Sequence, residues 1–154
     1  MKSLSVPTEE DWGDYKSDLD QKHAHRVFAG RTNQETQPFF RRNPIERTDE
    51  LRWMPEVPFR YYMLGFRDFI MANEFEFLGA SDAAKLFPWP CPRKTRQTAA
   101  VHCSNNAGTL PTIEHVARNQ NLFEAKESIY GNFLEKLARI AFKPFTLLTA
   151  VLNC

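Results

Sequence analysis

The residues from Met54 to Phe77 form the most apolar and aromatic window of the chain, and this window limits the fold more than any other feature. Pro58 stands where a helix can begin, because proline lacks an N–H that would be unpaired in the first turn anyway. Large side chains then recur at helical spacing, namely Phe59, Tyr62, Met63, Phe66, Phe69 and Ile70. A helix with so many large apolar side chains must bury one face, so we expect it to be the central packing element of a mainly α fold.

The N-terminal segment carries the signals of a first helix. Thr8 is followed by three acids, which predicts a cap and a dipole-favoured first turn, and Gly30 predicts the end. Gly13 weakens the first turn, so the helix can also begin near Asp14. Its predicted apolar stripe consists of Trp12, Tyr15, Leu19, His23 and Val27.

Two more helices are predicted before the central window. Thr32 and Glu35 match the capping box, in which a hydroxyl and a carboxyl satisfy exposed backbone amides. A short helix carrying Phe39 and Phe40 should follow. Asn43-Pro44 then reads as a cap and first position of a helix that ends at Trp53.

Helical signals return after the central window. Ser81-Asp82 predicts a capped start, which Pro88 ends within about two turns. Pro111 can start a helix, and the segment from Asn119 to Asn121 indicates a turn. A long amphipathic helix is then expected over 125–140.

Residues 85–109 differ from the rest, with three prolines, four Lys or Arg, two of the three cysteines and no acid. They predict one long irregular loop, and residues 143–154 an apolar tail. A chain of 154 residues is most simply one domain, so we expect a single compact domain over 1–154 with about six or seven helices.

Composition excludes several classes of function. A net charge of +1 with 25% charged residues predicts neither a nucleic-acid nor a membrane partner. The N-terminus turns acidic before any apolar run, unlike a signal peptide, and no window approaches the roughly 20 apolar residues of a membrane span. Three poorly spaced cysteines favour reduced thiols, and therefore a cytoplasmic protein.

Two groups of residues invite a metal hypothesis. Asp20, His23 and His25 are close in sequence, but histidines two apart on a helix point in different directions. Asp20 and His23 could chelate together, yet the sequence offers them no third ligand, and we expect a surface role. The second group consists of Cys91, His102, Cys103 and His115. It lacks the closely spaced ligand pairs of structural zinc sites. No metal and no cofactor are predicted.

Two alternative functions rest on the 85–109 loop. Cys91, His102 and Cys103 could form a Cys/His nucleophilic site of a small enzyme, although nothing supplies an orienting acid. The run from Arg93 to Arg96, with Trp89 nearby, could contact phosphates and stack a base, as in a nucleic-acid-associated accessory protein. A simply solvated loop is the plainer interpretation.

The acidic N-terminal segment is the stronger candidate for a binding surface. As helical positions, Asp11, Asp14 and Asp18 fall on one side, next to Trp12 and Tyr15. Carboxylates beside an aromatic anchor suit a basic protein partner, so these five residues are the predicted partner-binding site. The alternative is an ordinary solvated helix start. In the central helix, Arg60 and Arg67 are expected to pair with acids of neighbouring helices.

A family resemblance points in the same direction. The motifs that carry it are Met54-Pro-x-Val57-Pro58-Phe59-Arg60-Tyr61-Tyr62, Ser81-Asp82-x-Ala84, Trp12-x-Asp14-Tyr15 and the segment from Asn43-Pro44 to Trp53. They resemble small uncharacterised bacterial proteins found beside secreted polymorphic toxins as cognate immunity proteins. The resemblance covers residues about 10–84, with 110–140 as a further candidate segment. It implies a non-catalytic, cytoplasmic protein-binding module that neutralises a cognate toxin by occluding it.

Overall fold

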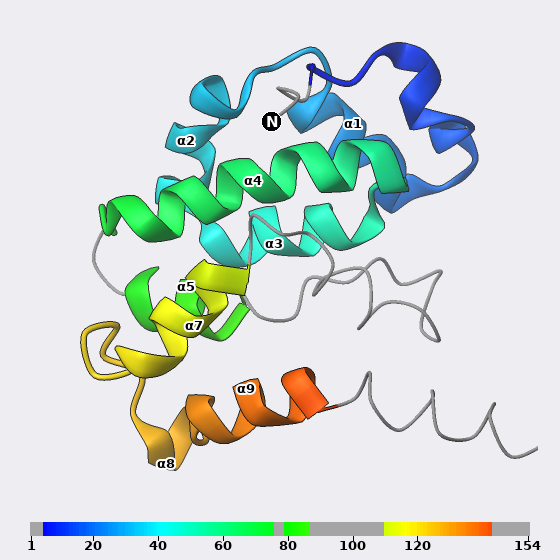
Figure 1. Cartoon of the computed structure of the whole chain (residues 1–154). Helices are drawn as coiled ribbons and strands as arrows, with labels where there is room; N and C mark the ends of the chain where they lie inside the picture. The colour runs from blue at the N-terminus through cyan, green and yellow to red at the C-terminus, as the bar shows by residue number, and fades with distance from the viewer. Residues whose placement is uncertain (1–4, 76–78, 87–109, 143–154) are drawn as a thin grey trace, which may run out of the picture.

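The computed structural model describes residues 5–75, 79–86 and 110–142, and these are mainly helical, which confirms the predicted fold class (Figure 1). Two short 3-10 turns come first, η1 at Glu9–Trp12 and η2 at Tyr15–Ser17. The helices are α1 (Leu19–Phe28), α2 (Asn33–Arg42), α3 (Pro44–Trp53), α4 (Glu56–Ala72), α5 (Gly79–Leu86), α7 (Leu110–Arg118), α8 (Glu127–Tyr130) and α9 (Phe133–Phe142). The predicted loop, from residue 87 onward, and the predicted tail lie outside the described residues.

Helix α4 is the central element that the sequence predicts. It contacts α2, α3, α7 and η1, and it is the long green helix across the middle of Figure 1. Its buried residues are Pro58, Phe59, Tyr61, Tyr62, Met63, Gly65, Phe66, Phe69 and Ile70. The helix begins at Glu56, two residues before the predicted start, and Pro58 therefore lies in the first turn, where its missing N–H costs no hydrogen bond.

Helices α2 and α4 approach closely at Gly65. A Cβ at this position would lie 2.5 Å from Oδ1 of Asn33. Two side chains of α2 then donate to the backbone of α4, Asn33 to the carbonyl of Tyr61 at 3.0 Å and Gln37 to that of Gly65 at 2.9 Å. The absence of a side chain at Gly65 thus permits hydrogen bonds between the two helices.

The predicted caps of α2 and α3 are confirmed. Thr32 and Glu35 form the capping box of α2. Asn43 caps α3 by accepting from the backbone N of Glu46 at 3.1 Å, and Pro44 takes the first position. These caps fix where α2 and α3 begin, and α3 packs beside α1.

The single N-terminal helix predicted up to Gly30 is wrong. Thr8 does cap a helical turn, but Gly13 adopts φ +57° and ends it. Asp18 then caps α1 by accepting from the backbone N atoms of Asp20 and Gln21. The segment is therefore two 3-10 turns followed by a helix that begins at Leu19.

Two details of the C-terminal part also differ from prediction. Ser81 lies inside α5, which begins at Gly79, so it does not cap the helix. The long helix expected over 125–140 is interrupted at Gly131, which has φ +72° and separates α8 from α9. Because of this break Ile129, predicted to be on the apolar side, is 71% exposed. The turn after α7 and the helix started by Pro111 are confirmed.

Among the described residues, no helix has both the length and the apolarity needed to cross a bilayer.

Candidate functional site

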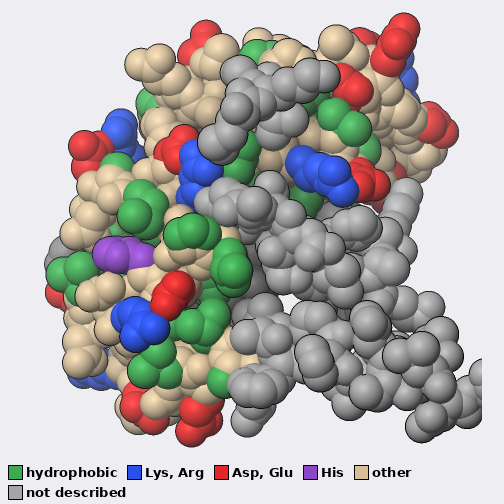
Figure 2. Space-filling view, in the orientation of Figure 1, with side chains coloured by type: hydrophobic (Ala, Val, Ile, Leu, Met, Phe, Trp, Pro, Cys, Tyr) green, Lys and Arg blue, Asp and Glu red, His purple; other side chains and the backbone are tan. Residues whose placement is uncertain are grey.

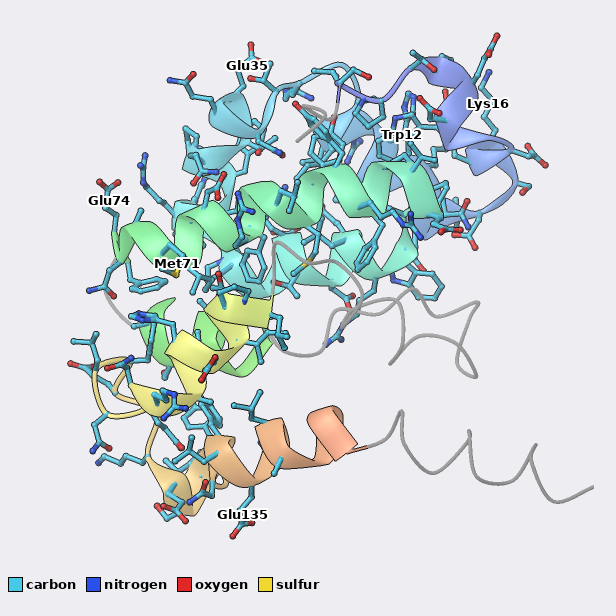
Figure 3. The ribbon with its side chains drawn as sticks, in the orientation of Figure 1. Trp12, Lys16, Glu35, Met71, Glu74 and Glu135 are labelled. Atoms are coloured by element: carbon cyan, nitrogen blue, oxygen red, sulfur yellow. The ribbon has the colours of Figure 1, made fainter. Side chains whose placement is uncertain are left out.

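Trp12, the predicted aromatic anchor of a partner surface, belongs to the core. Its side chain is 1% exposed and lies between the N-terminal turns and α4 (Figure 3). The indole ring is 6.3 Å from the ring of Tyr62 and meets the His25 ring edge-on at 5.0 Å. The surface of Trp12 is therefore already used inside the fold, and whether Trp12 contacts a partner stays a prediction.

The three acids predicted on one helical side do not share a helix. Asp11 closes the capping box of η1, accepting from Thr8 N at 2.7 Å, Asp14 precedes η2, and Asp18 caps α1. The predicted common face is wrong, because Gly13 and the cap at Asp18 divide the segment. Whether these acids contact a partner stays a prediction.

Tyr15 lies in a small cluster with Glu9 and His25. Its hydroxyl donates to Glu9 at 2.9 Å, its ring stacks on the imidazole at 3.7 Å, and Nε2 of His25 lies 2.8 Å from the same carboxylate. Hydrogen bonds from His25 and Tyr15 lower the pKa of Glu9. These contacts fix Tyr15 against α1.

The two arginines of α4 pair within their own helix. Arg60 lies 2.6 Å from Glu56, and Arg67 lies 2.6 Å from its neighbour Asp68. Among the described residues, the predicted ion pair with a neighbouring helix is not observed for Arg60, whose side chain is 50% exposed.

Helices α1 and α3 assemble a cluster that the sequence analysis missed. Nδ1 of His23, on α1, lies 2.9 Å from Oε1 of Glu50 on α3. Arg47 reaches two acids of α3, with Nε 3.1 Å from Oε2 of Glu50 and Nη2 2.8 Å from Oε2 of Glu46. Glu46 and Glu50 are four apart on the predicted helix, which was a readable signal; their approach to His23 depends on tertiary packing.

Glu50 is the unusual member of this cluster because it is only 5% exposed. Burial raises its pKa to about 7; Arg47 and Arg26 act in the opposite direction, whereas the neighbouring carboxylates Glu46 and Asp49 raise it further. Neither carboxylate oxygen accepts a well-oriented hydrogen bond, although the nitrogens of His23 and Arg47 are near. A buried carboxylate without oriented donors is costly and typical of a functional site.

The cluster opens into a cleft of about 480 Å³ between α1 and α3. Four carboxylates line it, those of Asp20, Glu46, Asp49 and Glu50. Its other lining side chains include Ile45, 52% exposed, together with Trp53 and Arg52. We call this the acidic cleft; it combines negative charge with apolar contact area.

A second cleft of opposite charge adjoins it. This arginine cleft, of about 580 Å³, is lined by the four guanidinium groups of Arg26, Arg31, Arg42 and Arg47. Glu46 lines both clefts and is the one acid among the residues that line the arginine cleft. Opposite charges therefore lie side by side along α1, α2 and α3.

The remaining sequence candidates are not brought into this site. His115 belongs to α7, where Asn119 lies near its ring. Cys91, His102, Cys103 and the run from Arg93 to Arg96 lie outside the described residues. In Figure 2, charged and hydrophobic side chains are interspersed on the part of this face that is not drawn in grey. The strongest described constellation is thus the His23–Glu50 cluster with its acidic cleft.

Comparison with known proteins adds no family, since the chain matches no protein-family model, no curated protein and no solved structure.

Proposed function

We propose that this chain is a non-catalytic protein-binding module whose acidic cleft receives a basic surface of its partner. The observation that carries this proposal is the cleft between α1 and α3, with four carboxylates and one arginine among its lining residues. Charge complementarity of this kind accelerates association and selects the partner. Ile45 and Trp53 supply apolar surface at the same place, which is the usual composition of the centre of an interface.

The adjoining arginine cleft supports a partner with two kinds of surface. A basic group in the acidic cleft and an acidic group in the arginine cleft would fix the orientation of the bound protein, because the reverse orientation would place like charges together. Binding of this type occludes the partner's own surface and needs no catalytic residue.

The finer proposal comes from the family resemblance. A cytoplasmic immunity protein that neutralises a secreted toxin would bind tightly over a toxin cleft and block it. A toxin that acts on nucleic acid or another anionic substrate has a basic cleft, and the acidic cleft of this chain suits such a target. The predicted acids of the N-terminal segment, Asp11, Asp14 and Asp18, would then lie at the periphery of the interface.

The experiment is co-expression with the product of the neighbouring gene, followed by titration calorimetry of the complex at low and high salt. Asp20→Lys with Asp49→Lys reverses two charges of the acidic cleft and leaves His23, Glu46 and Glu50 in place. We expect Kd to rise about tenfold or more, equivalent to about 1.4 kcal/mol, and the salt dependence to weaken.

The matched control reverses two exposed acids elsewhere, Glu114→Lys on α7 and Glu135→Lys on α9 (Figure 3), with the same change in net charge. Weakening by the cleft pair but not by the control pair supports the proposed surface. Equal weakening by both pairs, or by neither, would exclude the acidic cleft as the contact. Absence of any complex with the neighbouring gene product would contradict the immunity proposal.

A further inference from the structure

We propose that His23, Glu46 and Glu50 form a binding site for a divalent transition-metal ion such as Zn²⁺ at the base of the acidic cleft. Each residue offers one ligand atom, and the three atoms lie within 4.8 Å of one another. Imidazole nitrogens and carboxylate oxygens are both zinc ligands, and zinc sites with three protein ligands leave a fourth position open. The imidazole favours a transition metal over Mg²⁺ or Ca²⁺, which prefer oxygen ligands alone.

The contacts around the carboxylates leave room for an ion. Arg47 and Asn43 both contact Oε2 of Glu46, and Arg47 contacts Oε2 of Glu50. The Oε1 atom of Glu46 is therefore free of these contacts, and that of Glu50 faces Nδ1 of His23 at 2.9 Å. A metal ion bound by that nitrogen and that oxygen, at about 2.0–2.2 Å from each, requires them to separate by only a few tenths of an ångström.

A second observation is independent of the clustering. Glu50 is 5% exposed and lines the cleft, yet neither of its oxygens accepts a well-oriented hydrogen bond. A bound cation would coordinate the carboxylate oxygens, which accept no hydrogen bond from the described residues. Arg47 then acts as a neighbouring cation that orients both carboxylates through their Oε2 atoms, and the cleft provides the entry path.

The three ligands lie on two helices that pack against each other. Glu46 and Glu50 are one turn apart on α3, whose start is fixed by the Asn43 cap, and α1 packs directly against α3. Positions beyond the three protein ligands open to the cleft, so water or a group from a partner can complete the coordination.

The test is metal binding by the full chain after treatment with a chelator. Zn²⁺ is titrated by calorimetry, and Co²⁺ is used as a spectroscopic substitute because thiolate ligands give an intense charge-transfer band that nitrogen and oxygen ligands lack. This distinction matters because Cys91, Cys103 and Cys154 lie outside the described residues. We expect one ion per chain with a spectrum free of the thiolate band, and a raised Tm in the presence of Zn²⁺.

The variants are Glu46→Gln and His23→Asn, with Glu114→Gln and His25→Asn as matched controls. Glu114 lies on α7 and does not line the cleft, and His25 lies on the same helix as His23 but outside the triad. We expect at least about tenfold weaker binding in the two triad variants and unchanged binding in the controls. Circular dichroism checks that each variant folds, and Glu46 is the safer position because its side chain is 52% exposed.

Unchanged affinity in both triad variants would overturn the proposal, as would the absence of binding or a spectrum of thiolate ligation alone. The outcome is independent of partner binding, because the titration uses the isolated chain.

Discussion

Replacing Glu50 by glutamine should make the chain more stable at neutral and alkaline pH. Glutamine has nearly the shape of the protonated acid but cannot ionise. Glu50 is 5% exposed, and burial raises its pKa from 4.5 to about 7. The groups that face it are His23 and Arg26 from α1, and Glu46, Arg47 and Asp49 from α3.

The sign follows from proton linkage. Between pH 4.5 and about 7 the folded chain holds the Glu50 proton more tightly than the unfolded chain does, so the free energy of unfolding falls as the pH rises through this window. One pKa unit corresponds to about 1.4 kcal/mol, which gives a loss of up to about 3 kcal/mol by pH 8. Glu9 and Glu35 have lowered pKa values, and their stabilisation is lost only as the pH falls below 4.5.

The assay is urea unfolding of the wild type and Glu50→Gln at a series of pH values from about 5 to about 8, with a chelator present. The stability difference between them should grow with pH by up to about 3 kcal/mol in favour of glutamine. Because His23 lies 2.9 Å from Glu50, the same two proteins are also measured in a His23→Asn background, which shows how far the effect depends on this ion pair. A wild type whose stability is level or rising from pH 5 to 8, with the same slope in Glu50→Gln, would refute the reasoning.

Three further predictions concern the core. Gly65→Ala should cost about 1–2 kcal/mol in urea unfolding, despite the better helix propensity of alanine, because the new Cβ would lie 2.5 Å from Oδ1 of Asn33; a gain in stability would contradict the close approach. Tyr62→Phe should cost about 1–3 kcal/mol at neutral pH, since the hydroxyl bonds the carbonyls of Phe28 and Arg31. Burial raises the Tyr62 pKa to about 12, so the wild type should lose stability as the pH rises above 10, and the Phe variant should lose less. Trp12→Ala should lower the free energy of unfolding by about 3–5 kcal/mol and lower Tm, because the side chain is 1% exposed. A near-neutral effect would contradict its burial in the core.

The sequence predicted the elements whose signals are local. The Thr32 capping box, the Asn43 cap and the aromatic stripe of α4 all appear where residue spacing places them. The prediction from sequence overestimated helix length where a single glycine ends the helix. Gly13 and Gly131 adopt positive φ and divide segments whose apolar periodicity looks continuous.

The candidate site could be predicted only in part. Glu46 and Glu50 share one face of a helix whose bounds the sequence predicted, so their pairing was accessible. Their contact with His23 was not, because it depends on how α1 packs on α3. Trp12 shows a different difficulty. Periodicity places this aromatic side chain on an amphipathic stripe, but it does not tell whether the side chain is buried in the core or exposed beside the neighbouring acids.

Glu50 links α3 to α1 through its ion pair with His23, and it also pairs with Arg47 on its own helix. Thr48 and Leu51 are also buried on α3, and the hydroxyl of Thr48 donates to the carbonyl of Pro44. Arg47 also pairs with Glu46, and burial of the second carboxylate carries a desolvation cost that the nearby cations offset only in part, since its pKa is raised to about 7. That cost is offset once a further positive charge enters the cleft. A metal ion and a basic side chain of a partner would both supply one, so both proposals place a cation in the cleft that Glu50 lines.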